Sequence, residues 1–446
     1  MFSTCLHRFP PGTLLAGIYG NVFSFRFGSN KLVFVCGYKM VKEALVNQAD
    51  IFAERPFNPV FDRIYSGTGG GFFTSNGEKW KKQRHFALST LKSFGLGKST
   101  MEQCICEEIQ YLQDEIQSHK GSFTPAGLFN NAVSNIICQL VMGKRFDYSD
   151  NKFQTILCLL SETLYIEGTI WAQLYGSFPW LMKHLPGLHN KMFKNLETVL
   201  EFIAEEVEKH KPDLDPSNPR DYIDAFIIEM QNHKDSDAGF DETNLAYCSM
   251  DLFLAGTETT STTLQWALIY LIKHPEVQEK VQAEIDRVIG QSRLPTMADR
   301  ANLPYTDAVI HEIQRIANII PLNGLRLTSR DTTLGGYFIP KGTTIMPMLH
   351  SVLFDKTQWE TPDTFNPGHF LDKDGKFMKR DALLPFSAGK RVCLGEGLAK
   401  MELFLFLVGL MQKFSFYVPA GVKLRTDGVS GATRVPHPFE VHAKVR

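Results

Sequence analysis

The chain has no long hydrophobic run. Its first residues, MFSTCLHRFPPGTLLAG, contain no apolar stretch near the roughly 20 residues that a helix needs to cross a bilayer. They also lack the apolar core of a signal peptide. We therefore expect no membrane-spanning segment in these 446 residues.

An excess of charge of one sign is also lacking. The 47 Lys and Arg residues almost balance the 48 Asp and Glu residues, so the formal net charge is −1. A nucleic-acid-binding domain usually has a clear basic excess, and we therefore expect no nucleic-acid partner.

Cysteine is sparse, with eight residues and no CxxC pair. This excludes a disulfide framework and indicates a reducing compartment with mostly buried thiols. Linkers and internal repeats are missing too, because Pro, Gly and Ser are dispersed along the chain. We therefore expect one large domain rather than the roughly three that length alone suggests.

Strand patterns are few and helical patterns dominate. NVFSFRFG and KLVFVCG predict a β-hairpin, and TTLGGYFIPKGTTIMPML predicts a second one. Between about residues 38 and 320 the patterns are helical, and the longest, ETNLAYCSMDLFLAGTETTSTTLQWALIYLIKH, stops at Pro275. The predicted fold class is mainly α with small β-sheets.

Several common catalytic signatures are incomplete. GLGKST has Lys92 where a phosphate-binding loop needs glycine, and GTGGGF breaks GxGxxG at Phe72. HEIQR has Arg315 in place of the second zinc-binding histidine. A phosphatase-type nucleophile at Cys393 would need an arginine at Ala399. These absences remove most chemistries in which Cys393 would be a nucleophile.

The stretch PFSAGKRVCLGEG, residues 385–397, places Cys393 among glycines just before LAKMELFLFLVGLMQKF, which predicts a buried helix. The positive end of that helix, together with Lys390 and Arg391, favours a thiolate at Cys393. A thiolate at this position is either a nucleophile or a metal ligand, and a buried free cysteine in a turn is the remaining alternative.

The same stretch matches F-x-x-G-x-R-x-C-x-G at Phe386, Gly389, Arg391, Cys393 and Gly395. It resembles the cysteine loop of the cytochrome P-450 family of haem-thiolate monooxygenases, and most of all the animal family-two members of the J subfamily and their fish relatives. The resemblance implies the cytochrome P-450 fold, with a long central helix over haem b. Cys393 would be the iron ligand, which favours O–O cleavage, with Arg391 on a propionate and Phe386 shielding the sulfur.

Further family motifs occur in the expected order. In AGTETT, midway along the long helix, the resemblance makes Glu258 and Thr259 the catalytic pair that delivers protons to dioxygen. In WKKQRH, Trp80 and Arg84 lie one helical turn apart and would bind a haem propionate, as would Arg326. The alternatives are a polar stripe on the long helix and a solvated basic helix at residues 79–85.

Two acids, Asp251 and Glu258, interrupt the otherwise apolar long helix and need an explanation. Gly256 and the threonines after it should weaken the backbone hydrogen bonds of this helix. Their hydroxyl groups can also bond the helix carbonyls and bend it.

HEIQR carries Glu312 and Arg315, which match the E-x-x-R motif of the family. An exposed pair at this spacing stabilises a helix by only ~0.2–0.5 kcal/mol. In the family the pair is buried, and a later arginine joins it to lock the cysteine loop. Here FNPGHF has His369 instead, so we expect a weaker, pH-dependent third partner.

The resemblance covers residues 19–446, which we expect to be the catalytic domain. Residues 1–18 are interpreted as a remnant of the amino-terminal hinge, because PPGTLLAGIYGN leads almost directly to the hairpin and no anchor precedes it. Arg55 and Arg63 are candidates to hold a substrate carboxylate. The substrate pocket is expected to be formed by the 57–73 loop with Phe253, Leu254, Ala255, Leu322, Asn323 and Leu325.

The function implied is insertion of one oxygen atom of dioxygen into apolar substrates: fatty acids such as arachidonate by resemblance, or xenobiotics or steroids. Because no flavin or nicotinamide motif occurs, electrons should come from NADPH through cytochrome P-450 reductase, with cytochrome b5 as a second donor. Two alternatives stay open: a haem-thiolate isomerase or dehydratase, and a non-catalytic haem-binding paralogue. The expected basic docking face consists of Lys81, Lys82, Lys390 and Lys400.

The segment LYGSFPWLMKHLPGLH is apolar and interrupted by prolines. We expect it to insert shallowly into a membrane surface, where Trp and Tyr prefer to lie, with ordinary core packing as the alternative. The expected location is the cytoplasmic face of the endoplasmic reticulum membrane. The inserting residues would be Leu174, Tyr175, Phe178, Trp180, Leu181, Met182 and Leu185.

Overall fold

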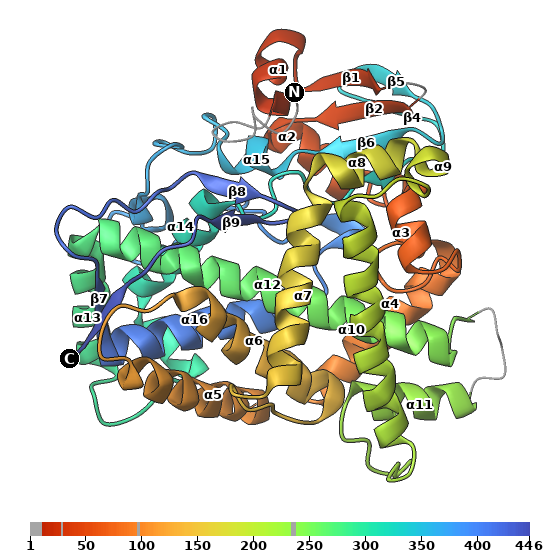
Figure 1. The fold of residues 1–446 in the computed structure, drawn as a ribbon. Coiled ribbons are helices and arrows are strands. Elements are labelled where there is room, and N and C mark those ends of the chain that lie inside the picture. The colour runs from red at the N-terminus through yellow and green to blue at the C-terminus, as the bar shows by residue number, and fades with distance from the viewer. Residues whose placement is uncertain (1–10, 28–29, 96–98, 233–237) are drawn as a thin grey trace. The chain divides into compact units, whose positions relative to one another are not determined.

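Figure 1 shows a computed structural model of the chain, which describes residues 11–27, 30–95, 99–232 and 238–446. The chain divides into two compact units. The first comprises the described residues of Met1–Pro56, Ile109–Ala126 and Thr262–Arg446, and the second those of Phe57–Glu108 and Gly127–Ser261. The boundaries between the units fall within α5 (Ser99–Ser118), α6 (Pro125–Met142) and α12 (Glu242–Lys273). The expected single domain over 19–446 stays a prediction.

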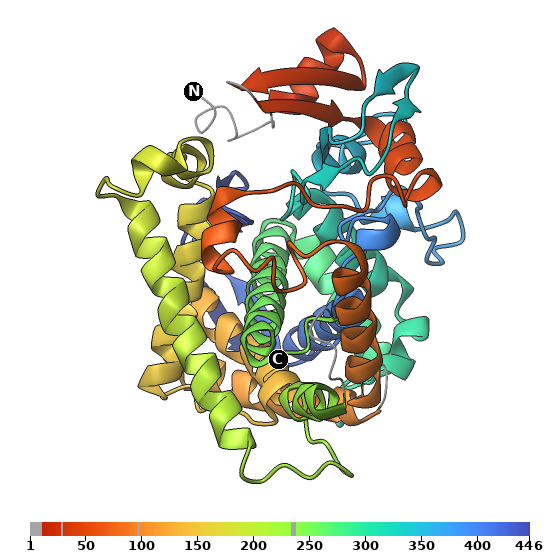
Figure 2. The same cartoon turned by 90° about the vertical axis from the view of Figure 1, so that its right-hand side faces the viewer.

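The first unit contains the sheets. β1 (Val22–Phe27) and β2 (Asn30–Val35) form the first predicted hairpin, visible at the top of Figure 2. β4 (Thr332–Leu334) and β5 (Tyr337–Ile339) form the second, around two glycines with positive φ, as a tight two-residue turn requires. β6 (Thr344–Pro347), expected to belong to that hairpin, instead joins a four-stranded sheet of order β1-β2-β6-β3, with β3 at Arg326–Leu327.

The remaining elements of the first unit are mostly helices. The helix predicted after Cys393 is confirmed as α16, and it is buried along most of its length. Residues 11–19, expected to belong largely to a hinge remnant, form α1. The remaining elements of the first unit are α1 (Pro11–Tyr19), α2 (Gly37–Lys42), η1 (Glu43–Asn47), α13 (Pro275–Val288), η3 (Met297–Asn302), α14 (Pro304–Ala317), α15 (Leu349–Leu353), η4 (Pro367–Phe370), η5 (Gly389–Arg391), α16 (Glu396–Lys413), β7 (Phe414–Tyr417), β8 (Gly428–Ser430), β9 (Arg434–Pro436) and β10 (His442–Val445).

The second unit is helical in its described residues, and α7 and α10 run side by side in it in both views (Figures 1 and 2). Besides half of α5, most of α6 and the first part of α12, its helices are α3 (Pro59–Ile64), α4 (Gly77–Ser93), α7 (Asn151–Glu167), α8 (Ile170–Ser177), α9 (Pro179–Met182), α10 (Leu188–His210) and α11 (Tyr222–Asn232). The mainly α fold class with small sheets is confirmed. Within the described ranges, none of the helices combines the length and hydrophobicity required to traverse a bilayer.

The long predicted helix is α12, which runs unbroken for 32 residues and ends before Pro275. Gly256 does not interrupt it. The Thr259 hydroxyl donates a hydrogen bond to the Ala255 carbonyl at 2.8 Å, which is the side-chain-to-backbone bond expected from the sequence.

A buried ion pair on α14 joins three segments of the first unit. Arg315 donates to both carboxylate oxygens of Glu312, at 2.8 and 2.7 Å, and both side chains are fully buried. Its remaining N–H groups donate to the carbonyls of Leu353, Pro362 and Thr364. The pair therefore fixes the chain between α15 and η4 against α14.

His369 is the third member of this group. Its Nδ1 lies 3.1 Å from Glu312 Oε2, and the backbone N–H of Thr361 donates to its Nε2 at 3.2 Å. Because Nε2 is the acceptor there, the proton of a neutral ring lies on Nδ1 and is donated to Glu312. The structure thus brings Glu312, Arg315 and His369 together, while the locking role and its pH dependence stay predictions.

Replacing Arg315 with Met should lower the free energy of unfolding by ~3–5 kcal/mol, because Glu312 would become a buried charge without its cation. Urea denaturation measures this change. Arg425→Met is the matched control, since the ion pair of Arg425 with Asp427 is largely exposed and should contribute little. Equal losses in the two variants would contradict a stabilising role for the buried pair.

Asp251, one of the two acids that interrupt α12, holds the loop that follows α3. Asp251 accepts hydrogen bonds from the Tyr65 hydroxyl at 2.6 Å and the Phe72 backbone N–H at 2.7 Å. Asn244, two turns earlier, accepts from the Gly71 N–H at 2.9 Å. A Cβ at Gly71, where φ is +69°, would collide with the Asp251 carboxylate. Asp251 is therefore an anchor for this loop.

Burial raises the pKa of Asp251 to about 6, although the hydrogen bonds from Tyr65, Phe72 and Phe73 lower it. The pKa of an unfolded Asp is about 3.9. Because the folded-state pKa is the higher one, the folded chain binds this proton more tightly. The resulting stability is fully present below about pH 4 and is lost as the pH rises through about 6.

The free energy of unfolding of the unmodified protein should therefore fall by up to about 3 kcal/mol relative to that of Asp251→Asn between pH 4 and pH 7. Denaturant titrations across this range measure the difference. Asp147→Asn, at an exposed aspartate, is the control and should show no such fall. A difference independent of pH at Asp251 would contradict the buried, titrating carboxyl.

Candidate active site

The cysteine loop is fixed by a close backbone contact. Gly389 has φ +74°, and a Cβ at this position would overlap the carbonyl oxygen of Leu45, so only glycine fits. The N–H of Cys393 donates to the carbonyl of Phe386 at 3.0 Å, which closes the loop just before α16. The Cys393 side chain is exposed. The loop therefore presents this thiol near the amino end of a buried helix.

Other cysteines differ from Cys393 in their surroundings. Burial raises the pKa of both Cys36 and Cys106 to about 11, and it raises the pKa values of Cys138 and Cys248 well above the usual range. These thiols stay protonated at neutral pH and are poor ligands. The expected structural role of the buried cysteines is consistent with this.

Three arginines gather in the first unit. Arg391 donates to the carbonyl of Ala53 at 2.7 Å, and Arg55 donates to that of Leu325 at 2.5 Å. Arg326 and Arg391 are both buried. Burial lowers the pKa of Arg55 well below its ordinary value, and the charges of Arg326 and Arg391 lower it further. Like charges buried together favour binding of an anion with more than one negative charge.

This donor set suits the two propionates of a haem. Arg326 and Arg391 were predicted for that role, whereas Arg55 was assigned to a substrate carboxylate. The structure places Arg55 near these two arginines, and its binding of a substrate carboxylate stays a prediction. This proximity could not be predicted from the sequence, because Arg55 lies about 270 residues from its hydrogen-bond partner, Leu325.

Asn323 contacts the cysteine loop. Its Nδ2 donates to the Ser387 hydroxyl at 2.9 Å, and both residues have positive φ values. Such backbone geometry is unusual for residues other than glycine and often marks functional loops. Leu322, Asn323 and Leu325 are all half-buried, and their role as pocket walls stays a prediction.

The expected catalytic pair lies on the part of α12 in the second unit. Glu258 is buried, and its Oε2 accepts a hydrogen bond from the Ser161 hydroxyl on α7 at 3.1 Å. Thr259 is half-buried. Among the predicted pocket residues of this helix, Phe253 is fully buried in the core, Leu254 is half-buried and Ala255 is exposed. Ala255 and Leu254 therefore suit a pocket wall better than Phe253 does.

Trp80 and Arg84 lie on α4, as expected, one turn apart. Trp80 is buried and Arg84 is half-buried, whereas Lys81 and Lys82 are exposed. The side-chain pattern is that of a helix with one inward face, which argues against a basic helix solvated all round.

Arg63, on α3, is engaged within the second unit. Its guanidinium lies over the rings of Phe193, at 4.1 Å from the centroid, and Tyr175, at 5.6 Å. Such cation–π contacts satisfy part of its charge. Its binding of a substrate carboxylate stays a prediction.

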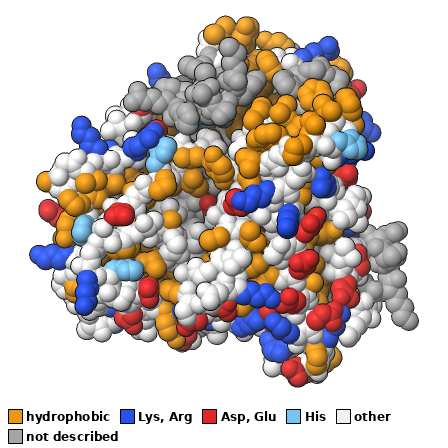
Figure 3. Space-filling view, in the orientation of Figure 1, with side chains coloured by type: hydrophobic (Ala, Val, Ile, Leu, Met, Phe, Trp, Pro, Cys, Tyr) orange, Lys and Arg blue, Asp and Glu red, His pale blue; other side chains and the backbone are white. Residues whose placement is uncertain are grey.

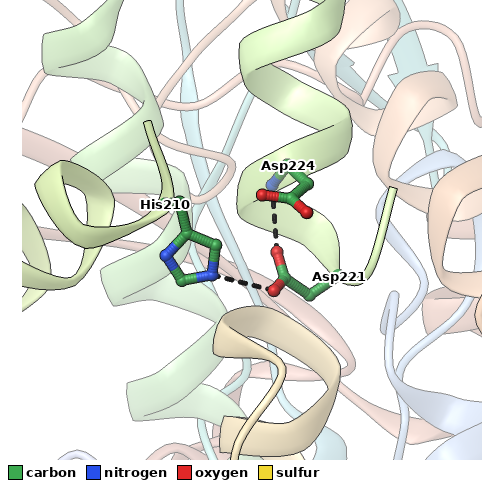
Figure 4. A group of neighbouring side chains, drawn as sticks. All are labelled: His210, Asp221 and Asp224. Carbon is green, nitrogen blue, oxygen red and sulfur yellow. Dashed lines mark hydrogen bonds and ion pairs between the residues drawn. The ribbon is translucent and has the colours of Figure 1, made fainter. Parts of the chain in front are cut away.

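A further group of titratable residues was not anticipated from the sequence. Figure 4 shows His210 at the end of α10 facing Asp221, with Asp224 behind it, and their ligand atoms lie within 4.8 Å of one another. His210 Nε2 lies 2.8 Å from Asp221, and Nδ1 lies 2.6 Å from the Glu206 carbonyl. Both ring nitrogens therefore act as donors, as in an imidazolium. Burial lowers the pKa of His210, but its hydrogen bond to Asp221 and the nearby acceptors outweigh this and raise it.

The carboxylates of this group are also occupied. Asp224 accepts two hydrogen bonds from the Arg220 guanidinium, and the N–H of Asp224 donates to Asp221 at 2.9 Å. A charged imidazole cannot ligate a metal through its protonated nitrogens. The group is therefore a buried ion network that joins α10 to α11, with a cation at a helix end where the dipole favours it.

The comparisons with known proteins agree with the family resemblance of the cysteine loop. The sequence profile of the family described as Cytochrome P450 matches residues 13–443. Cytochrome P450 2J2 from Homo sapiens is 49% identical over 420 residues, which cover 94% of this chain and 83% of that protein. Cytochrome P450 2J5 from Mus musculus is 48% identical, covering 95% and 84%. Cytochrome P450 2C8 from Homo sapiens is 45% identical, covering 96% and 88%.

These similarities extend over almost the whole chain. The chain therefore belongs to the cytochrome P450 family and is a monooxygenase that uses haem b.

Proposed function

We propose that this monooxygenase oxidises long, apolar, membrane-partitioned substrates, foremost polyunsaturated fatty acids, with electrons from NADPH through a separate reductase. The observation that carries the chemistry is the cysteine loop, in which Gly389 fits against Leu45 and presents Cys393. The fatty-acid assignment rests on the similarity to the J-subfamily relatives. Xenobiotics and steroids are the alternative substrates.

The proposed roles in haem binding follow from the contacts. Cys393 would supply the thiolate ligand, and Phe386 would shield its sulfur. Arg326 and Arg391 would bind the propionates, with Trp80 and Arg84 contributing from α4, and we add Arg55 because it lies near both of the other buried arginines. Bound haem supplies the activation of dioxygen and the transfer of one oxygen atom.

Glu258 and Thr259 are proposed to deliver protons. A buried carboxyl group on α12 can hold a proton, and the neighbouring hydroxyl can orient its transfer. An isomerase or dehydratase acting on peroxides needs no such pair, so the pair favours a monooxygenase with an external electron donor. The same argument disfavours a non-catalytic paralogue.

The proposed electron donors are NADPH-cytochrome P-450 reductase and, secondarily, cytochrome b5. In the first unit, a hollow of about 280 Å³ beside the cysteine loop is lined by Phe386, Lys42, Lys379 and Lys400, among others. The ammonium of Lys400 lies 5.6 Å from the ring centroid of Phe386. Lys390, in the cysteine loop, is exposed, and so, separately in the second unit, are Lys81 and Lys82 on α4. These cations suit an acidic donor domain.

The proposed membrane contact rests on apolar side chains that are exposed in the second unit. Phe178, Trp180, Leu181 and Leu185 are exposed, and Figure 3 shows apolar side chains gathered over α8 and α9. Tyr175 and Met182, which the sequence assigned to the same surface, pack instead in a core cluster. Since Trp180 keeps 66% of its surface exposed, a lipid interface is a favourable partner for it. The cytoplasmic face of the endoplasmic reticulum is the proposed location.

Cys393→Ala should abolish the far-shifted Soret band that a thiolate-ligated haem shows after reduction and treatment with carbon monoxide. The reason is loss of the sulfur ligand. Difference spectra of purified protein measure this band. Cys158→Ala, which removes another exposed thiol, is the control and should retain it. An unshifted band in the unmodified protein would refute the thiolate assignment.

Trp180→Glu combined with Leu181→Glu should lower binding to phospholipid vesicles about tenfold or more, because it removes two apolar groups from the interface. Vesicle co-sedimentation measures binding, and the carbon monoxide spectrum checks that haem is retained. Tyr111→Glu combined with Tyr417→Glu is the control, because these exposed rings lie outside the α8–α9 surface. Unchanged binding in the first variant would contradict the membrane contact, and oxidation of steroids without oxidation of any fatty acid would contradict the substrate class.

A further inference from the structure

One face of α6 lies against the glutamate-bearing turn of α12. Asn130, Ser134 and Ile137 are spaced four and three residues apart, which places them on the same face of α6. A Cβ on Gly256 would overlap the side chain of Ile137, so glycine permits the close approach of the two helices. Beside it, the hydroxyl of Ser134 is hydrogen-bonded to that of Thr257 at 3.2 Å.

The next contact along this face reaches Glu258 through α7. Asn130 Nδ2 donates to the Ser161 hydroxyl at 3.4 Å, and Ser161 donates to Glu258 Oε2 at 3.1 Å. A hydroxyl has a single proton, and the hydrogen supplied by Asn130 leaves that proton directed at Glu258. The carboxylate on α12 is thereby connected to both α6 and α7.

We propose that Ser161 is a positioning residue, which holds the Glu258 carboxyl group in the conformation from which it delivers protons. The inference rests on the proposed proton-delivering role of Glu258. When Glu258 gives up its proton, the hydroxyl of Ser161 donates to a full negative charge, and such charge-assisted bonds are the stronger ones. Without Ser161, the side chain of Glu258 gains rotamer freedom and its carboxylate loses a donor.

Asn130 has a supporting part in this arrangement. Its Oδ1 is buried and has no hydrogen-bond partner among the described residues, so the Ser161 contact is the one recorded for its side chain. A buried amide with an unused acceptor is unfavourable unless it serves another purpose. Orienting Ser161 is such a purpose.

The experiment compares Ser161→Ala, Ser161→Thr and Ser134→Ala in the haem-loaded enzyme with its reductase. Ser161→Thr keeps a hydroxyl. Ser134→Ala removes a neighbouring hydroxyl that bonds to α12 but does not contact Glu258 in the hydrogen bonds observed. The measurements are the division of NADPH electrons between product and hydrogen peroxide, and the side-chain conformation of Glu258 in crystals of each variant.

In Ser161→Ala, coupled product formation should fall about threefold to tenfold and peroxide should rise, as expected for the loss of one hydrogen bond of typical net strength. The crystal should show Glu258 in a different or divided rotamer. Substrate affinity and the carbon monoxide band should not change. Ser161→Thr should restore most of the coupling, and Ser134→Ala should stay near the unmodified enzyme in both measurements.

Glu258→Gln separates this inference from the function on which it rests. If Glu258→Gln uncouples the reaction but Ser161→Ala does not, the positioning role is refuted and the proton role of Glu258 stands. If neither variant uncouples, both are refuted. If Ser161→Ala uncouples equally with and without Glu258→Gln, Ser161 acts elsewhere and the inference is wrong. We expect the double variant to add little to Glu258→Gln alone.

Discussion

The contact between Gly389 and the carbonyl of Leu45 fixes where the cysteine loop can lie, and the surrounding structure of the first unit depends on it. The chain from Leu45 to Arg55 continues this support. Ala53 accepts a hydrogen bond from Arg391, and four residues earlier in the loop Ser387 accepts one from Asn323. Arg55 bonds the Leu325 carbonyl just before β3. One short segment therefore positions the thiol-bearing loop and the arginines together.

This contact explains why residue 389 must be glycine and why no residue with a side chain can replace it. Any Cβ at Gly389 would displace a backbone carbonyl, which cannot move aside as a flexible side chain can. A displaced loop would separate Arg391 from Ala53. The position of Cys393 and that of the buried arginines are thus parts of one constraint.

Buried charges in the molecule fall into two kinds, and the difference separates stability from function. Glu312 and Arg315 satisfy each other almost completely, and the other N–H groups of Arg315 are used by backbone carbonyls. Arg55, by contrast, lies near Arg326 and Arg391; burial lowers its pKa, and these like charges lower it further. Removal of one partner from a satisfied pair destabilises the fold, whereas clustered like charges favour a bound anion.

The sequence predicted those features whose signals are contiguous. The cysteine loop, the helix α12 and both hairpins each lie within one stretch of chain, and local pattern was sufficient for them. The pairing of β6 with β2 was not predicted, because a parallel partner can lie anywhere along the sequence. For the same reason the proximity of Arg55 to Arg326 and Arg391 was not predicted: its position depends on the segment just before β3, far along the chain.

The two acids of α12 show both what local sequence pattern cannot decide and how the structure decides it. Asp251 and Glu258 are seven residues apart, hence on nearly the same face of the helix, and the sequence alone offers a polar stripe as readily as a function. Their partners distinguish them. Besides the Tyr65 hydroxyl, Asp251 accepts from two backbone N–H groups of a loop, and these cannot move unless the loop moves.

Glu258 instead accepts from the hydroxyl of Ser161, which can follow a carboxyl group by rotation about a single bond. A donor that rotates can stay bonded while the acid gains and loses a proton, whereas a fixed backbone donor favours one charge state and one position. The surroundings of Asp251 are therefore those of an anchor. Those of Glu258 suit a group that must change its protonation state without leaving its place.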